Sequence, residues 1–368
     1  MDADSVKILI SMIIYMIIVL GIGVYFTRRA QSSTENYFLG GRTLGPWVTA
    51  MSAEASDMSG WLLMGLPGVA YWCGIADAAW TAIGLALGTY INWLIVAKRL
   101  RRYSIKANNS ITLPEFFSNR FHEKNKVILS IAAIFILIFF TVYAASCLVT
   151  CGKLFSTLFG TSYVTMMILG TIFVLLYTLL GGFLAESASD FLQAIVMIVA
   201  LIVIIFAGTS AAGGFGAVVE NAKSIPGFLD FFGIATPVVE NGAQVVANGV
   251  PVFGESARYG IISIASTLAW GLGYFGMPQV LLRFMAIRDE KKLTMSRRIA
   301  TVWVLISLAA AVFIGVIGRS LFPTALLTSS SAENILIIMS TSLLPALLAG
   351  LVMAGILAAT LSSSDSYL

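Results

Sequence analysis

The residues best suited to chemistry in this sequence are polar ones inside long apolar stretches. The first group is the segment 52–61, in which Asp57 lies between Ser56 and Ser59. Asp57 follows Pro46 by about 16 Å of helix, which is near the middle of a bilayer. An unpaired carboxylate is expensive there, so it needs a cation, a proton or hydrogen-bond donors. Ser56, Ser59 and Gly60 tolerate a break in this helix, and a break exposes backbone oxygens that, with carboxylate and hydroxyl oxygens, suit Na⁺. The alternative is that Asp57 and the serines satisfy one another.

A second group of residues occupies 270–278. Three glycines and Pro278 within this segment predict a helix that is unwound or kinked. Trp270 and Tyr274 are four residues apart and therefore share a helix face. Their rings would form an apolar cage with hydrogen-bonding tips, which suits a small ring or aliphatic substrate. The competing interpretation is close helix packing through the glycines.

Further hydroxyl and acidic groups lie at membrane depth. The segment 358–366 carries consecutive Ser and Thr residues, which offer oxygen ligands or hydrogen bonds between helices. The hydroxyl of Tyr143 needs a hydrogen-bond partner, which is either a substrate or another helix. Asp190 follows two glycines and is either a charge at the start of a helix or a second cation ligand. Glu54 is expected to face a water-filled vestibule.

The elements that position these residues are membrane-spanning helices. Of the 368 residues, 58% are hydrophobic and 11% are charged, with a mean hydropathy of +0.93; a soluble domain has about 25% charged residues. Each of nine apolar stretches is long enough to cross a bilayer. They are 6–27, 46–72, 75–97, 127–151, 163–180, 189–211, 258–282, 299–322 and 334–368.

The basic residues predict the orientation of these helices. We place 5 of the 22 Lys and Arg residues on one side, namely Lys7, Lys153, Lys223, Arg258 and Arg319. The other 17, which include Arg283 as a loop residue, lie in loops on the opposite side, which is therefore expected to be cytoplasmic. The N-terminus is then outside, and the first stretch is a spanning helix, because Arg28 and Arg29 follow it in place of a signal-peptide cleavage site.

Two segments have no clear chemistry. The loop 212–257 is expected either to cover the outer mouth or to be a variable surface loop. The chain stops at Leu368 directly after Ser-rich sequence. From this we expect a piece of a longer protein that ends inside or just after a helix.

Several function classes are excluded by what the sequence lacks. Its three cysteines have no CxxC or CxxH spacing and it has a single histidine, so a zinc or haem site is not expected. Cys147 and Cys151, one helical turn apart, are expected to be core residues. No GxxxxGK[ST], HExxH or GxSxG motif is present. We therefore expect no enzyme, no organic cofactor and no nucleic-acid partner, and uphill transport would draw on an ion gradient.

The same segments resemble the sodium:solute symporter family along nearly the whole chain. SDMSGWLLMGLPG at 56–68 and WGLGYFG at 270–276 are typical of its proline-transporting branch. Further matching stretches are YFLGGRTLGP at 37–46, 108–109 with 112–114, 181–185 and 356–359.

This resemblance implies an all-α integral membrane protein with an inverted-repeat core of five plus five helices. Residues 1–45 would form an extra first helix and loop, 46–211 the first repeat, and 258–368 a partial second repeat. The chain would form a single transmembrane transporter domain, 1–368, that is truncated in the second repeat. The resemblance further implies a multi-pass protein of the cell membrane, with the bacterial cytoplasmic membrane as its expected location.

The resemblance also implies site residues. Na⁺, the coupling ion, would bind between the broken helix that contains Asp57 and the last helix of the chain. Its ligands would be Ala55, Met58, Ala359, Ser362 and Ser363. Asp57 matches an aspartate needed for sodium coupling, and Asp190 matches a possible second sodium ligand. Gln279 replaces a frequent histidine, and Asp365 lies outside the branch's pattern. The implied substrate pocket is Trp61, Tyr143, Trp270, Tyr274 and Pro278.

The function expected from these features is sodium-driven uptake of a small amino acid, above all proline, by alternating access. Its partners would be that substrate and the lipid bilayer, with no obligate protein partner. One alternative is symport of another small solute. Another is a sensory input domain of a longer membrane kinase. A passive channel fits less well, because a buried carboxylate and an aromatic cage suit stoichiometric binding.

Overall fold

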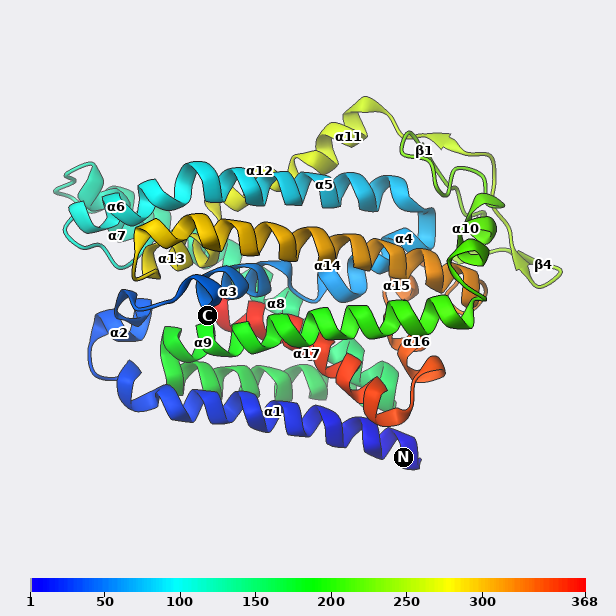
Figure 1. Cartoon of the computed structure of the whole chain (residues 1–368), viewed down its shortest axis with the longest axis horizontal. Helices are drawn as coiled ribbons and strands as arrows, with labels where there is room; N and C mark the ends of the chain where they lie inside the picture. Colours follow the sequence, from blue (N-terminus) through cyan, green and yellow to red (C-terminus); the bar gives the residue numbers. More distant parts are fainter. Residues whose placement is uncertain (1) are drawn as a thin grey trace.

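The fold was analysed in a computed structural model that describes residues 2–368. It is a bundle of helices that run roughly along one direction (Figure 1). The first half contains α1 (Ala3–Ala30), α2 (Thr34–Leu39), η1 (Gly40–Arg42), α3 (Pro46–Met58), η2 (Trp61–Gly65), α4 (Leu66–Cys73), α5 (Ile75–Asn92), η3 (Trp93–Ala97), α6 (Lys98–Lys106), α7 (Leu113–Arg120), α8 (Val127–Phe159) and α9 (Tyr163–Ala211). The second half contains α10 (Phe215–Lys223), six strands, α11 (Ile261–Leu268), α12 (Trp270–Gly273), η4 (Tyr274–Gly276), α13 (Pro278–Ala286), η5 (Glu290–Lys292), α14 (Leu293–Leu321), α15 (Ser329–Ala332), α16 (Ile335–Leu343) and α17 (Ala346–Tyr367).

The connecting segments gather at two opposite ends of the bundle. Figure 1 shows α2, α6 and α7 at one end, and α10 with the strands at the other. We call these the basic end and the loop end, because the first carries most of the basic connections. This separation is the one that the alternation of basic loops predicts.

The loop end is more ordered than the sequence suggested. The segment 212–257, predicted as a loop, contains α10 and most of three antiparallel two-stranded sheets. The pairs are β1 (Gly233–Ile234) with β6 (Ala257–Arg258), β2 (Val239–Glu240) with β3 (Ala243–Gln244), and β4 (Val246–Ala247) with β5 (Val250–Pro251). The fold is therefore helical in its bundle, with short β-hairpins confined to one end.

Helix breaks explain how nine predicted stretches relate to the observed helices. In the described residues, six helices are long and apolar enough to cross a membrane, and a seventh span forms if the bent pair 261–276 and 278–286 is counted as one. The 49-residue α9 is interrupted at Gly182 (φ 54°, ψ −162°), between the predicted stretches 163–180 and 189–211. The stretch 46–72 is broken at Ser59.

The last predicted stretch, 334–368, is wrong as a single helix. It forms α16 and α17, which are separated at Leu344 and Pro345. Leu344 has an extended backbone (φ −111°, ψ 148°), as expected for a residue before proline, where the helical conformation is sterically disfavoured. Only α17 is then long enough to reach deep into the bundle.

The helix α17 is the centre of the bundle. It is buried along nearly its whole length and contacts α1, α3, α8 and α9. Figure 1 shows it crossing behind α9, with the C-terminus near the start of α3. The hydroxyl-rich end of α17 is thereby placed beside α3, the part of the stretch 46–73 that precedes the break at Ser59.

Glycines let α12 approach α5 at backbone contact. A Cβ atom added to Gly88 would lie 2.2 Å from the carbonyl oxygen of Gly271, and one added to Gly271 would lie 2.0 Å from that of Gly84. Backbone atoms cannot move aside as side chains do. The packing interpretation of the 270–276 glycines therefore holds for Gly271, whereas Gly273 and Gly276 meet nothing within 4 Å.

This contact makes a prediction for stability. We expect Gly88→Val to destabilise the protein by about 3 kcal/mol, because the added methyl groups must push two helices apart. Ala86→Val is the matched control, since Ala86 lies two residues away on the same helix and lines an apolar cavity with room for two methyl groups. Thermal unfolding in detergent, followed by tryptophan fluorescence, should show a lower Tm for Gly88→Val alone.

At the basic end, Arg42 joins three segments. Its guanidinium donates hydrogen bonds to the Oδ1 of Asn109 (3.2 Å), the Oγ of Ser104 (3.2 Å) and the carbonyl oxygens of Ser110 (2.9 Å) and Met285 (2.8 Å). Burial lowers the pKa of Arg42 to about 10, so the side chain stays charged at neutral pH. The loop before α3 is thus fixed to α6, to the α6–α7 connection and to the end of α13.

Candidate functional site

The broken stretch 46–73 supplies the first part of the site. Ser59 has a positive φ (51°) and an extended ψ (−174°), which ends α3 before a π-helical turn begins at Trp61. The Oγ of Ser59 accepts a hydrogen bond from the Trp61 amide (3.2 Å), which partly replaces the lost helix bonds. A break of this kind leaves backbone oxygens free to bind ligands at mid-depth.

The second broken stretch faces the first. α13 is bent by 45° from the helix before it, and Met277 at the bend is extended (φ −77°, ψ 107°) because it precedes Pro278. The carbonyl oxygen of Tyr274 is bonded to the side-chain amide of Asn92 (2.7 Å), which satisfies one oxygen freed near the bend. The predicted kink in 270–278 is therefore present, and it lies between Gly276 and Pro278.

A cavity of about 300 Å³ lies between these two breaks. Four of the five residues predicted for a substrate pocket line it, namely Trp61, Tyr143, Trp270 and Tyr274. The rings of Trp61 and Trp270 are 5.3 Å apart at an interplanar angle of 32°. Asp57, Met58, Ser59, Leu85, Gly273 and Met277 complete the lining. The cavity thus combines aromatic walls with one carboxylate, which suits a small organic molecule that carries a positive charge, a cation, or both.

Pro278 does not line this cavity. It borders a second one, of about 560 Å³, together with Gln279, Phe140, Ser366 and Tyr367. Tyr367 stacks on Tyr143 with ring centroids 4.6 Å apart, so these two rings lie between the cavities. The structure therefore separates Pro278 from the other four predicted pocket residues by one helix turn and an aromatic pair.

Asp57 has no cationic partner in the part of the chain that the structure describes. It is 8% exposed, towards the cavity, and the six ion pairs formed by residues 2–368 do not include it. Glu54 differs from the expectation that it faces a vestibule. It is 1% exposed, and its Oε1 accepts a hydrogen bond from the indole of Trp93 (3.1 Å). Asp57 is therefore the acidic side chain of α3 that faces the cavity, whereas the Oε2 of Glu54 is buried without a partner in residues 2–368.

The predicted cation ligands meet where α3 crosses α17. The hydroxyl of Ser362 donates to the carbonyl oxygen of Ala55 (2.8 Å) and lies 3.3 Å from that of Ala359. The Oγ of Ser363 is buried and has no hydrogen-bond partner in the described chain. Met58 lies one helix turn further along α3 and lines the cavity. An oxygen-rich junction with one unsatisfied hydroxyl fits a small hard cation.

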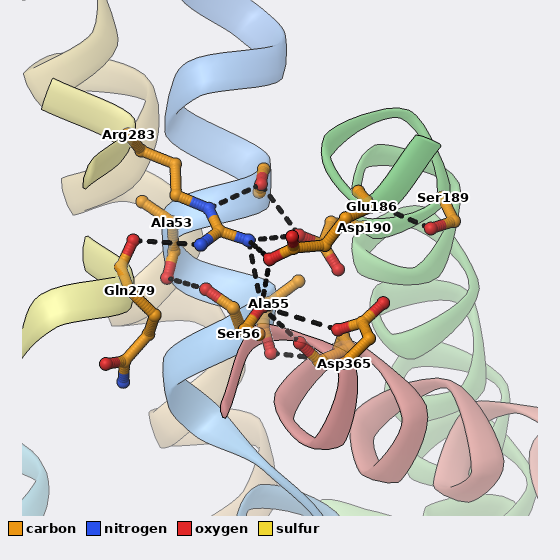
Figure 2. Close-up of polar contacts among 12 residues, drawn as sticks. Ala53, Ala55, Ser56, Glu186, Ser189, Asp190, Gln279, Arg283 and Asp365 are labelled. Carbon is orange, nitrogen blue, oxygen red and sulfur yellow. Dashed lines mark hydrogen bonds and ion pairs between the residues drawn. The ribbon is translucent and has the colours of Figure 1, made fainter. Parts of the chain in front are cut away.

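A buried polar cluster adjoins this junction (Figure 2). Arg283, which is 1% exposed, forms ion pairs with Glu186 and with Asp190 (2.9 Å), and donates to the hydroxyls of Ser52 (2.9 Å) and Ser366 (2.8 Å). These partners come from α9, α3 and α17, whereas Arg283 belongs to α13. We call Arg283, Glu186, Asp190, Ser52 and Ser366 the arginine cluster.

The arginine cluster corrects the predicted position of Arg283 and excludes one of the two interpretations of Asp190. Arg283, assigned to a cytoplasmic loop from the sequence, is inside the bundle. Asp190 is not a charge at a helix start, because the helix resumes after Gly182 and the dipole effect is limited to the first turn. Its Oδ2 accepts from Ser52 (2.7 Å), while its Oδ1 is buried without a partner in residues 2–368.

Asp365 extends the cluster towards α9. Its Oδ2 accepts a hydrogen bond from the hydroxyl of Tyr177 (2.6 Å), and it is 2% exposed. Its Oδ1 lies 3.3 Å from the hydroxyl of Ser366, which also accepts from Arg283, so three buried carboxylates belong to a network that holds one arginine. This excess of acid favours an additional positive charge nearby. Gln279 is buried with both amide atoms unpartnered in the described chain, on the opposite side of Arg283 from these acids.

Sequence reasoning missed Arg283 and Glu186. The available signal was the spacing of Glu186 and Asp190, four residues apart on one helix face, which required a cation from another helix. The predicted apolar stretch 258–282 ends one residue before Arg283, and this boundary places Arg283 in a loop. Membership of a loop or a helix cannot be decided from sequence at that precision.

Known proteins match this chain along most of its length. The model of the sodium:solute symporter family matches residues 37–368. Sodium/proline symporters of Staphylococcus aureus strains USA300 and JH9 are each 39% identical over 355 residues, covering 96% of this chain and 64% of the relative. The chain therefore spans somewhat less than two thirds of the length of these relatives.

A solved structure shares the fold. A Na⁺-coupled sialic acid symporter in a substrate-bound, outward-open state aligns with a TM-score of 0.74 at 18% identity, over 98% of this chain and 72% of that one. At this identity the likeness concerns the fold alone. The resemblance inferred from the motifs is confirmed by the match to the family model: this chain belongs to the sodium:solute symporter family.

Proposed function

We propose that the protein is a secondary transporter of the cell membrane, not an enzyme, that couples Na⁺ entry to the uptake of a small amino acid, above all L-proline. The observation that carries this proposal is the 300 Å³ cavity, in which Trp61, Trp270 and Tyr274 surround space beside the unpaired Asp57. Membership of the family and the names of the relatives support both the ion and the substrate.

The cavity suits proline for physical reasons. The pyrrolidine ring is apolar and compact, so it gains by burial against aromatic faces. Its secondary ammonium group is attracted to aromatic rings and to the carboxylate of Asp57. The hydroxyl of Tyr143 would bind the substrate carboxylate, whereas that of Tyr274 is directed at the Sδ of Met58 (3.9 Å). Pro278, at the neighbouring cavity, would act on a substrate that has passed the aromatic pair Tyr143–Tyr367.

Sodium would bind at the junction of α3 and α17. We assign its ligands to the carbonyl oxygens of Ala55, Met58 and Ala359 and to the hydroxyls of Ser362 and Ser363, with Asp57 supplying negative charge from the same helix. Binding would replace the direct Ser362–Ala55 hydrogen bond by bonds to the ion. Because those ligands come from two helices, the ion would brace the broken α3 against α17.

A second sodium site is proposed at Asp190. It is supported by the unpartnered Oδ1 of Asp190 and by the two carboxylates, those of Glu186 and Asp190, that share a single arginine. Ion and substrate would then promote each other's binding, because each stabilises the same arrangement of broken helices. Alternating access follows if the outer path closes around the loaded site and the inner path opens.

The two breaks also support the proposed repeats. In the division of 1–45, 46–211 and 258–368, each repeat would begin with a broken helix, interrupted at Ser59 and at Met277 respectively. Paired broken helices facing a central site are typical of inverted-repeat transporters.

Uptake of labelled proline into proteoliposomes tests the proposed function. The whole protein should accumulate proline under an inward Na⁺ gradient and not under an equal K⁺ gradient. Excess unlabelled alanine, glycine betaine or other small solutes should compete poorly. Proline uptake that ignores Na⁺ would disprove the coupling, whereas Na⁺-driven uptake of a competing solute in place of proline would reassign the substrate.

The unsatisfied hydroxyl of Ser363 makes a separate prediction. Ser363→Ala should raise the Na⁺ concentration for half-maximal uptake by about 10-fold, the effect of losing one bond of about 1.4 kcal/mol to an ion. It should not lower Tm, because no hydrogen bond within the chain is lost. Ser364→Ala is the matched control: Ser364 is equally buried, but its hydroxyl is bonded to the Thr360 carbonyl oxygen (2.7 Å).

An equal change of sodium dependence in both serine variants would contradict the assignment of Ser363. In that case the hydroxyls of α17 would act only through helix packing.

A further inference from the structure

A groove on the outside of the bundle is not used by the proposed transport site. It lies between α3, α9 and α14, and has a volume of about 460 Å³. Its lining is apolar, with Met51, Val199, Val302 and Ile306 among the contributors, and Trp47 and Arg298 are also part of it. The structure assigns this groove to an anionic phospholipid: we propose that one acyl chain lies in it while the lipid phosphate binds Arg298.

The position of the groove matches one leaflet of a bilayer. Trp47 is in the first turn of α3 and Arg298 is in the second turn of α14, so both lie near the basic end of their helices. Arg298 and Ile306 are separated by about 12 Å along α14. This length is close to half of a ~30 Å hydrocarbon layer. The groove thus runs from the interface to near the bilayer centre, as an acyl chain does.

Its polar rim favours a negatively charged headgroup. Arg298 is exposed and takes part in none of the ion pairs or side-chain hydrogen bonds formed by residues 2–368. Among the described residues, no acidic side chain lines the groove. Trp47 is 52% exposed, and tryptophan prefers the level of the headgroups. An unpaired arginine at the level of the headgroups, beside an apolar groove, is complementary to the phosphate and acyl chain of a phospholipid.

Arg298 differs in this respect from the arginine beside it. The guanidinium of Arg297 lies over the ring of Tyr90, 5.3 Å from its centroid, and is directed towards α5. Arg298 is therefore the cation that belongs to the groove.

A lipid acyl chain fits this groove better than a helix of another protein does. Helices associate within membranes through small residues that permit close backbone approach. The exposed walls of the groove are instead bulky, with Val302 56% and Ile306 50% exposed. A flexible chain can follow such a surface. Because Trp47 and Met51 belong to α3, a bound lipid would contact the helix that also forms the proposed sodium site with α17.

Native mass spectrometry of the whole protein in detergent tests this proposal. Phosphatidylglycerol and phosphatidylcholine with identical acyl chains would be titrated separately. We expect one phosphatidylglycerol to be retained at least five-fold more strongly than phosphatidylcholine. Arg298→Gln should weaken phosphatidylglycerol binding about five-fold, the effect of one basic residue near an anionic surface. It should weaken phosphatidylcholine binding less, because the choline cation offsets the charge of the phosphate. Val302→Trp, which fills the groove, should reduce the binding of both.

Two matched variants control for general effects. Leu305→Trp places the same bulk on α14 at a residue of similar exposure (53%) that borders a different cavity. Arg28→Gln removes an exposed arginine in the last turn of α1, the turn that leads to α2 at the basic end. Neither should change lipid retention.

Three results would overturn the proposal. They are equal retention of the two lipids by the unchanged protein, no effect of Arg298→Gln, and equal losses in Arg298→Gln and Arg28→Gln. A dimer that Val302→Trp dissociates without altering lipid retention would instead assign the groove to a second copy of the chain.

Discussion

Asp57→Asn is expected to abolish sodium-driven uptake while the protein remains folded. Asparagine keeps the shape of the side chain but removes the negative charge that Asp57 presents to the cavity. Because no cation of residues 2–368 pairs with this carboxylate, its charge is available to Na⁺ and to the substrate ammonium group. Losing about 3 kcal/mol of this attraction would lower the initial uptake rate at least 100-fold at limiting Na⁺.

The matched control for Asp57 is Asp77→Asn. Asp77 is in the first turn of α5, where its Oδ2 accepts a hydrogen bond from the hydroxyl of Tyr259 (2.9 Å), away from the cavity. Its substitution should leave Na⁺-dependent uptake within about two-fold of normal, since a surface charge contributes little. Initial rates would be measured over a series of Na⁺ concentrations. If Asp57→Asn retained normal sodium dependence, Asp57 would be no part of the coupling mechanism.

Arg283→Gln is expected to cause the largest loss of stability. The substitution leaves the carboxylates of Glu186 and Asp190 buried without their cation, and breaking a buried ion pair from one side costs about 3–5 kcal/mol. It also removes the hydrogen bonds by which α13 is joined to α3 and α17. We expect little monodisperse protein in size-exclusion chromatography, and a strongly lowered Tm for what remains.

Restoring the charge balance separates electrostatics from packing in the arginine cluster. Adding Glu186→Gln to Arg283→Gln removes one uncompensated carboxylate, so the double variant should be more stable than Arg283→Gln alone. Arg288→Gln, at an exposed loop residue five positions further on, should match the unchanged protein. If Glu186→Gln gave no rescue, the loss would come from the hydrogen bonds and packing of Arg283 rather than from its charge.

The contrast between Asp57 and the arginine cluster has a functional meaning. Both are acidic sites at depth, yet one lacks a cation and the other holds an arginine among α3, α9, α13 and α17. The first can bind a mobile ion without displacing a protein group. The second joins the helices that carry both breaks, so any opening between α13 and α17 must rearrange its bonds. The arginine cluster is therefore expected to report on movement at the basic end, and Asp57 on ligand binding.

The sequence predicted features that depend on composition and local chemistry. Long apolar stretches with basic loops indicated a membrane bundle, since hydrophobicity and charge act on each segment separately. Proline and glycine indicated the bend near Pro278, and serine with glycine indicated the break at Ser59. The motifs 56–68 and 270–276 indicated the family, because chemistry at mid-depth limits which residues can stand there.

Only the tertiary structure decided which of these residues act together. It placed Trp61, Tyr143, Trp270 and Tyr274 around one cavity and put Pro278 at another, because the bend turns α13 away from α12. It also moved Arg283 from a supposed loop into the core. Pairing between helices depends on how far each turns and tilts, and a shift of one residue rotates a side chain by about 100°. Periodicity along one helix cannot specify that rotation relative to another, whereas close packing of all the helices does.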